Sequence, residues 1–270
     1  MTEPKTSLDL LGIKGISDSL HVATKGCIDG AAAFLSRVCL PAAEEFGLAL
    51  RDRIGAWRAA NAVKMLNRAN ELDLQHSAST RRSINPRLVQ LALDEASWID
   101  DDEISGMWAG LLASSSTHDG KSDENLIFMT ILQQLSSLQV RVLKYSVETA
   151  GKFTVLDGLP FAHPLEVPTS ELTKLFLGFD LHRIDRELDH LVNIGLIGSS
   201  GSGGIDVGGG HLARLTPTSL ALNLYVRAQG TKQTPAEYWK LQPGSPMDYD
   251  AIELGTVPDQ AAAAPTNSPS

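Results

Sequence analysis

The sequence is organised around Glu95–Ala113, which reads EASWIDDDEISGMWAGLLA. Asp100 to Glu103 are four consecutive acids, and apolar residues at helical spacing follow them. Apolar positions i, i+3, i+4, i+7 and i+8 lie on one face of an α-helix. Here they are Ile104, Met107, Trp108, Leu111 and Leu112. We predict a helix that begins at the acids and whose apolar face lies at the centre of a helical bundle.

The four acids allow two interpretations. Asp100 as the N-cap, with Glu103 three residues later, predicts a capping box at a helix start. Asp101 and Asp102 would then lie favourably at the positive end of the helix dipole. A metal site is the alternative, but the alternating acids and central glycine of a calcium-binding loop are absent from this stretch. We favour the helix start and expect neither a metal nor a cofactor.

Composition limits the class of protein. The chain has 270 residues, of which 43% are hydrophobic and 20% charged, and its net charge is −9. These values are typical of a globular protein, and the excess of acids argues against broad binding to a phosphate backbone. No apolar run reaches the roughly 18 residues that a membrane span needs. With no recognisable signal peptide, and with Cys27 and Cys39 expected as buried reduced thiols, we predict a cytoplasmic protein.

We expect a mainly α fold in four parts. Residues 1–40 form an apolar, glycine-interrupted segment, in which Ala31–Leu40 is the strongest helical candidate. Residues 41–136 are predicted to form a bundle of about four helices, 137–230 a winged-helix-like (α+β) module with a small β-hairpin, and 231–270 a disordered tail. The N-terminal helix either packs on the main body or serves self-association or contact with a membrane surface. Its polar face has few basic residues, which counts against the membrane.

Polar residues mark the helix starts within the bundle. Asn85 followed by Pro86 predicts an N-cap and the first residue of a helix. Ser122 or Asp123 is the predicted cap of the helix over 126–135. Residues 73–83 are polar and are predicted to form a loop.

The helix that contains Trp57 carries a basic face, formed by Arg51, Arg53, Arg58, Lys64 and Arg68. Such a face is usually solvated or paired with acids on a neighbouring helix, and the acids at 100–103 are the candidate partners. A surface for nucleic acid or an acidic protein is the less favoured interpretation.

Residues 137–230 alternate between helices and short strands. This order is typical of a winged helix, in which a β-hairpin forms the wing. The expected elements are a helix over 138–150, a strand over 153–155, a proline-rich loop through Pro160, Pro164 and Pro168, a helix over 171–177, a helix capped by Asp180, a strand from Leu196, the glycine-rich loop 198–210, a strand over 211–215 and a last helix with Leu220, Leu224 and Tyr225.

The winged-helix order raises the question of DNA binding. Arg183 and Arg186 are the candidate nucleic-acid contacts, but acids alternate with them, and the loop 198–210 contains no Lys or Arg. Specific binding to DNA needs phosphate contacts that such a surface barely supplies. We therefore favour protein contact or dimerisation over nucleic acid as the role of this module.

No catalytic signature is present in the sequence. It lacks GxSxG, HExxH and phosphate-loop motifs. His182 and His190 share a helix, but at i, i+8 they lie too far apart to bind one ion. We therefore name no catalytic residue and expect a protein that is not an enzyme.

Three segments in combination resemble the bacterial abortive infection alpha (Abi-alpha) family, over roughly residues 41–230. The first segment matches at Trp57, Arg58 and Asn61. The second matches at Pro86, Glu95, Ala96, Ser97, Asp102, Trp108, Ala109, Leu111, Leu112 and Ala113. The third matches at Ile131, Leu132, Gln134, Leu135 and Ser136. The resemblance implies a role in antiviral (phage) defence and supplies no catalytic residues.

Our leading hypothesis is therefore a non-enzymatic protein of the abortive-infection type. It would act through protein–protein contacts, with an unknown partner or as a homo-oligomer. A winged-helix transcriptional regulator that binds DNA is the first alternative. A membrane-surface effector that acts through residues 8–40 is the second.

Overall fold

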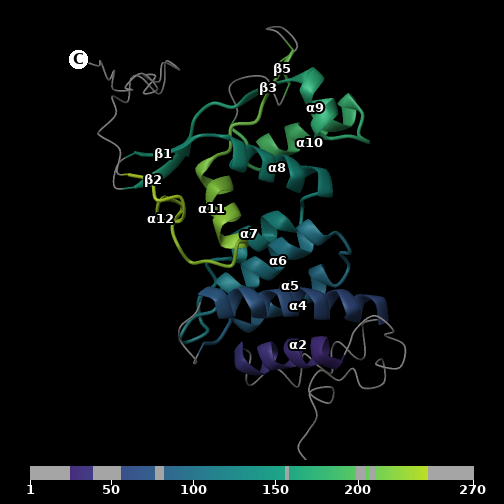
Figure 1. Cartoon of the computed structure of the whole chain (residues 1–270), viewed down its shortest axis with the longest axis vertical. Coiled ribbons are helices and arrows are strands. Elements are labelled where there is room, and N and C mark those ends of the chain that lie inside the picture. The colour runs from purple at the N-terminus through teal and green to yellow at the C-terminus, as the bar shows by residue number, and fades with distance from the viewer. Residues whose placement is uncertain are drawn as a thin grey trace, which may run out of the picture.

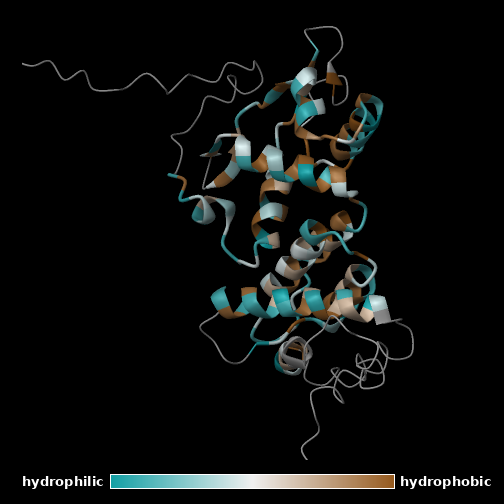
Figure 2. Cartoon of the chain, turned by 45° about the vertical axis from the view of Figure 1, so that its right-hand side comes forward, coloured by the Kyte–Doolittle hydropathy of each residue, from teal (hydrophilic) through white to brown (hydrophobic). Residues whose placement is uncertain are grey.

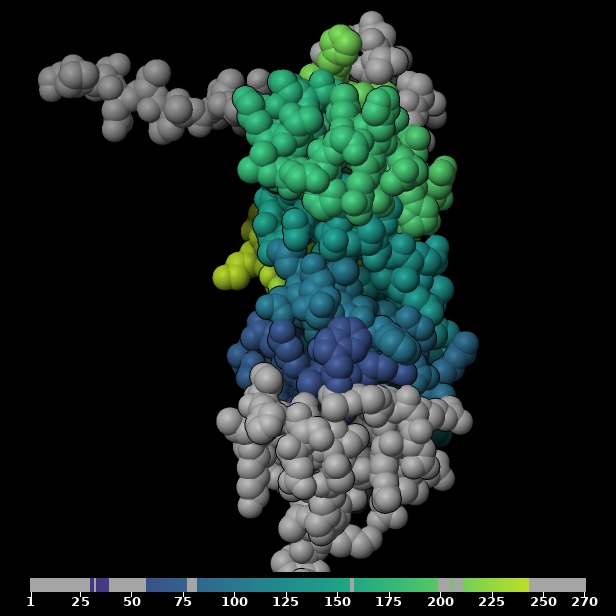
Figure 3. All heavy atoms as spheres, turned by 90° about the vertical axis from the view of Figure 1, so that its right-hand side faces the viewer, coloured from purple at the N-terminus to yellow at the C-terminus, as the bar shows by residue number. Residues whose placement is uncertain are grey.

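The computed structural model describes residues 25–38, 56–76, 82–155, 158–198, 205–206 and 211–242. These residues contain ten helices and five short strands, so the prediction of a mainly α fold is confirmed. The elements are stacked along the long axis of the molecule (Figures 1 and 3). The helix α2 (Lys25–Val38) lies towards one end, and the strands β3 (Glu166–Pro168) and β5 (Leu212–Arg214) lie at the other.

The helix α6 (Asp102–Ser114) lies at the centre of the fold. It packs against α4 (Ala56–His76), α5 (Pro86–Ala96), α7 (Leu126–Leu132), α8 (Ser137–Thr149) and α11 (Ser219–Ala228). Trp108, Leu111 and Leu112 are completely buried, as predicted from their spacing. The four helices α4 to α7 are the elements expected for residues 41–136, and α4 extends through 73–76, which were predicted as loop.

The helix α2 packs on α4, which is amphipathic along its length (Figure 2). The apolar side chains of α2 that are buried are Ala31, Phe34, Leu35 and Val38. The N-terminal helix thus packs on the main body. The rest of the segment 1–40, the residues Arg51 and Arg53 and the side chains of Cys27 and Cys39 lie outside the described residues.

Two of the predicted helix caps are correct and two are displaced. Asn85 accepts a hydrogen bond from the Arg87 amide, and Asp180 caps α10 (Leu181–Asn193). The N-cap of α6 is Asp101, not Asp100, because its carboxylate accepts hydrogen bonds from the amides of residues 103 and 104. Asn125 stands at the start of α7 in place of Ser122 or Asp123, and its side chain is buried instead of capping.

The region predicted as a proline-rich loop contains two strands, so that prediction is wrong. The strand β2 (Leu159–Ala162) pairs with β1 (Lys152–Val155), and Pro160 stands opposite Thr154. The strand β3 ends at Pro168 and lies at the edge of the sheet β3-β5-β4, in which β4 is Ile205–Asp206. Proline is tolerated on edge strands because one side of such a strand needs no ladder hydrogen bond. The strand expected from Leu196 is reduced to an isolated bridge between Ile197 and Pro217.

The helices α9 (Thr169–Leu175) and α10 follow β3, as expected from the sequence. The described part of the glycine-rich segment is Gly198 and the strand β4. The predicted domain boundary at residue 136 stays a prediction. The helix α11 packs on both α8 and α6, and one cluster of buried side chains runs from Ala31 to Ala228, across that boundary.

The tail predicted to be disordered from residue 231 is ordered at its beginning. Residues 231–242 include α12 (Pro235–Tyr238), whose start is a capping box between Thr234 and Glu237. Trp239 stacks on Tyr225 of α11, with ring centroids 6.1 Å apart. The capping motif and the aromatic contact account for the order, and both are readable in TPAEYW.

Candidate functional site

The acids at the start of α6 are used in ion pairs. Asp102 pairs with Lys64 of α4, which confirms part of the predicted pairing between the acids and the basic face. Glu103 faces the other way, towards α8, where Lys144 lies 3.1 Å and Arg141 3.9 Å from its carboxylate. The two acids thus bridge α6 to a helix on each side. Among the described residues, no group of three or more His, Cys, Asp or Glu side chains is arranged to hold a metal.

The motif residues of α4 and α5 meet at Ser97. The guanidinium of Arg58 donates two hydrogen bonds to the Ser97 hydroxyl, at 3.1 and 2.8 Å. Asn61 donates to the backbone carbonyl of the same residue at 3.2 Å. Arg58 also lies over the ring of Trp98, 3.8 Å from its centroid. Ser97 is completely buried, so this contact is a structural junction between two helices.

The third motif segment is joined to the same assembly by polar contacts. Glu95 accepts a hydrogen bond of 2.7 Å from Gln133, at the end of α7. Ser136 caps α8 and donates a hydrogen bond of 3.0 Å to Glu187 of α10. By contrast, Trp57 is half exposed. The motif residues Arg58, Asn61, Glu95, Ser97 and Ser136 therefore join neighbouring helices.

We expect the variant Ser97→Ala to lower the free energy of unfolding by about 1–2 kcal/mol, because it leaves donors of Arg58 without their partner. Asp102→Asn should cost less than about 1 kcal/mol, because it weakens an exposed ion pair. Chemical denaturation measures both changes. A larger loss for Asp102→Asn than for Ser97→Ala would contradict this assignment of structural roles.

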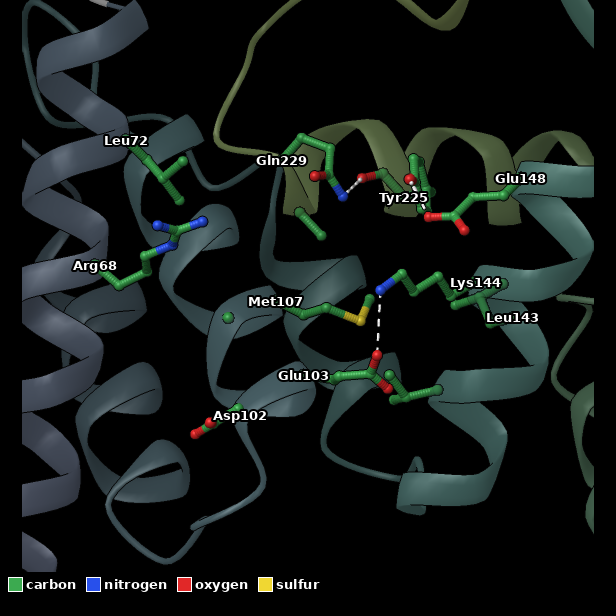
Figure 4. A pocket seen from close by; sticks show the side chains of 13 residues that line it. Arg68, Leu72, Asp102, Glu103, Met107, Leu143, Lys144, Glu148, Tyr225 and Gln229 are labelled. Atoms are coloured by element: carbon green, nitrogen blue, oxygen red, sulfur yellow. Dashed lines mark hydrogen bonds and ion pairs between the residues drawn. The ribbon is translucent and has the colours of Figure 1, made fainter. Parts of the chain in front are cut away.

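A cavity of about 410 Å³ opens beside the acidic start of α6, between α4, α6, α8 and α11 (Figure 4). Its walls carry charged groups and apolar groups together. The side chains that define it are Arg68, Met107, Lys144, Glu148, Tyr225 and Gln229. A more open groove of about 700 Å³ between α4 and α6 shares Arg68, Asp102 and Gly106 with this cavity. The cavity and the groove therefore adjoin each other along α6.

Tyr225 is the group in this cavity with the most perturbed acidity. Its hydroxyl donates a hydrogen bond of 2.9 Å to Glu148. Partial burial, and then the hydrogen bond and the negative charge of Glu148, raise the pKa of the Tyr225 phenol well above its ordinary value. The phenol is therefore a neutral hydrogen-bond donor at every physiological pH and is not a base.

This perturbation predicts a dependence of stability on pH. In the unfolded chain Tyr225 ionises near pH 10, whereas in the folded chain it keeps its proton. Above pH 10 the unfolded state therefore binds fewer protons, and stability falls as the pH rises. Denaturation midpoints between pH 9 and 11 should decline more steeply for the wild type than for Tyr225→Phe. Equal slopes would contradict the assignment.

The predicted nucleic-acid contacts lie on α10 and are partly neutralised. Arg183 lies over the ring of Phe179 at 4.6 Å and pairs with Glu187 at 3.6 Å. Arg186 is exposed on the same helix, which also carries the carboxylates of Asp185 and Asp189. This surface presents mixed charge, as expected from the sequence.

Three exposed leucines lie beside these arginines, and sequence reasoning did not single them out. Leu175 ends α9, Leu177 lies in the connection, and Leu181 begins α10, with exposed fractions of 45%, 78% and 41%. We call these three residues the leucine patch. The face that carries α9 and α10 forms the upper part of Figure 3. Single exposed leucines are ordinary, whereas contiguous exposed apolar surface marks interaction sites. These three exposed leucines lie within seven residues of the chain.

The fold is that of a helical protein in which several motif residues join neighbouring helices. Its described surface has a cavity lined by charged and apolar groups, and it also carries the leucine patch. The profile of the family described as Abortive infection alpha matches residues 60–206, more than half of the chain. The chain therefore belongs to this family, and membership suggests a function of the abortive-infection type. No curated protein and no solved structure matches the chain. None of the described helices is both long enough and apolar enough to cross a membrane.

Proposed function

We propose that this protein takes part in phage defence as a cytoplasmic, non-enzymatic protein that acts through protein–protein contacts. Residues 60–206 match the abortive infection alpha family, which supports the defence role. The observation that carries the mode of action is the leucine patch on α9 and α10. Its three apolar side chains lie in water at the point where two helices of the second half meet. Covering them with a partner would release that apolar surface from water.

The non-enzymatic part of the proposal is supported by how the polar groups near α6 are used. Asp102 and Glu103 are ion-paired with Lys64 and Lys144. The phenol of Tyr225 is held protonated by burial and by Glu148. General acid–base chemistry needs a group whose pKa lies near the working pH, and Tyr225 is moved away from it.

In this proposal the second half, which the sequence predicts to be a winged-helix-like module, has a protein-binding role. In a winged helix that binds DNA, the second helix of the motif presents basic residues to the major groove. Here α10 presents Arg183 and Arg186 among carboxylates, and its first residue is the exposed Leu181. A DNA-binding regulator predicts salt-sensitive binding to duplex DNA that Arg183→Glu or Arg186→Glu abolishes. We expect no such binding at low salt.

A membrane-surface effector is the remaining alternative. The buried apolar side chains of α2, Phe34 among them, are already covered by packing on α4. We therefore expect no flotation with vesicles that contain anionic lipid. Flotation that is lost on deletion of residues 8–40 would favour the membrane over a protein partner.

The proposal is tested by expressing the full chain in a bacterium that is challenged with phages. We expect fewer plaques, together with poor survival of the infected cells, because abortive infection sacrifices the infected host. Uninduced cells and cells that carry the empty vector are the controls. Plaque counts and host survival that both remain unchanged would overturn the defence role.

A further inference from the structure

Two small cavities meet at one side chain, Lys232, at the end of α11 and away from the surfaces described above. One cavity, of about 320 Å³, is lined by Ser114, Ser115, Asn125 and Arg227 among others. The other, of about 300 Å³, is lined by Asp73, Arg82 and Thr231 among others. Lys232 lines both cavities. The volume of each cavity is at the lower end of the range that is usual for small-molecule sites.

The second cavity has an excess of positive charge. Its carboxylate, Asp73, is buried and is already neutralised by Arg37, whose guanidinium lies 2.8 Å away. The other oxygen of Asp73 accepts a hydrogen bond of 3.0 Å from Ser116. Arg82 and Lys232 form no ion pair with a carboxylate in the described part of the chain, and Arg82 has only a long hydrogen bond to Ser116, at 3.5 Å.

A third cation adds to this excess. Arg227 lies on the side of the first cavity and is paired with the exposed Glu124 at 3.2 Å. Partial burial lowers the pKa of Lys232, and the positive charges of Arg82 and Arg227 lower it further, while the carboxylates of Asp73 and Glu124 act in the opposite direction. Like charges that share a site are stabilised by an anion placed among them.

One residue that lines the first cavity, Asn125, has a buried acceptor without a partner. Asn125 is 2% exposed, and its amide nitrogen donates to the Leu111 carbonyl and to the hydroxyls of Ser114 and Ser115. Its Oδ1 atom is buried and has no hydrogen-bond partner. A buried acceptor without a partner is uncommon and costs stability.

We propose that these cavities bind a small phosphorylated molecule. Arg82 and Lys232 hold the phosphate, because both offer charge-assisted hydrogen bonds that no described carboxylate takes. The body of the ligand lies in the serine-lined cavity, whose wall includes Ser114, Ser115 and Asn125. Arg227 adds positive charge beside the phosphate. The site is independent of the leucine patch, and its failure would leave the proposed function untouched.

The first test uses inorganic phosphate as the probe. Thermal unfolding of the full chain is compared in phosphate and in chloride at equal ionic strength. We expect phosphate to raise the melting temperature of the wild type, and Lys232→Met and Arg82→Gln to lose that rise. Lys174→Met is the matched control, since Lys174 is an exposed lysine on α9, and it should keep the rise.

The second test determines whether the body of the ligand contributes to binding. Calorimetric titration compares 5′-mononucleotides, the matching nucleosides and inorganic phosphate. We expect the nucleotides to bind most tightly and Lys232→Met to weaken them by at least about tenfold, the size of a lost charge-assisted hydrogen bond.

Three outcomes would overturn the proposal. Equal melting temperatures in phosphate and chloride would remove the phosphate site. A phosphate response that survives in both Lys232→Met and Arg82→Gln would remove the assignment to these residues. Nucleotides that bind no better than phosphate would remove the placement of the ligand's body in the serine-lined cavity.

Discussion

Replacement of Gly110 by alanine is expected to be among the most damaging single changes in this chain, with a loss of about 3 kcal/mol in the free energy of unfolding. A Cβ atom at this position would lie 1.7 Å from the backbone oxygen of Ala228. That oxygen belongs to the end of α11, so a side-chain rotation cannot relieve the overlap. The helices α6 and α11 would have to move apart, and the packing between the two halves of the molecule would be lost with them.

Gly106 in the same helix is the matched control. A Cβ atom there would meet no atom within 4 Å. Gly106→Ala should therefore raise stability by up to about 1 kcal/mol, because alanine favours a helix interior over glycine. Urea denaturation of both variants measures the difference. A Gly110→Ala variant as stable as Gly106→Ala would contradict the close packing of α6 on α11.

The second large effect is expected for Trp108→Ala, which should lower the free energy of unfolding by about 3–5 kcal/mol, as is usual when removal of a buried aromatic side chain leaves a cavity. Trp108 is completely buried in α6. The helix α6 packs against α4, α5, α7, α8 and α11, so a cavity at its centre cannot be closed by the movement of a single helix. Thermal and chemical denaturation measure the loss.

A second substitution separates volume from hydrogen bonding at this position. The indole nitrogen of Trp108 is buried without a partner. Trp108→Phe removes that unsatisfied donor and keeps most of the apolar volume, so it should cost much less than Trp108→Ala. If the two variants lost the same free energy of unfolding, the apolar volume of the ring would not be the main contribution of Trp108 to stability.

The central helix was predictable because its signal is local and periodic. The five apolar positions from Ile104 to Leu112 share one face whatever the rest of the chain does. Its N-cap was displaced by one residue because four consecutive acids offer several equivalent caps. Which of the four acids caps the helix depends on the path of the chain into the helix, and this path cannot be read from the spacing of residues.

The short strands illustrate the opposite case. Pro160 and Pro168 are strong loop signals, and the pairing of β2 and β3 depends on partners that are distant or too short to show a pattern. Trp57, a motif residue near the start of α4, is half exposed. Burial at a helix end depends on which elements lie over it, and a periodic pattern does not contain that information.

The candidate sites were even less accessible from the sequence. Each motif residue around Ser97 was identifiable, but its partner was not, because Arg58 and Ser97 lie 39 residues apart. The cavity at Tyr225 joins side chains from four helices, and the cluster at Lys232 joins residues that lie as far apart in the chain as Asp73 and Lys232. The leucine patch was overlooked because Leu175 and Leu181 fit the apolar pattern of ordinary helices.

The central claim is that a folded protein acts in defence through its leucine patch. It is tested most directly by comparing phage protection by the wild type, Leu177→Lys and Leu159→Lys. Leu177 is the most exposed residue of the patch, and Leu159 is an exposed leucine of β2 outside it. Both substitutions should leave the melting temperature unchanged. We expect Leu177→Lys to abolish protection and Leu159→Lys to retain it. Full protection by folded Leu177→Lys would contradict the account.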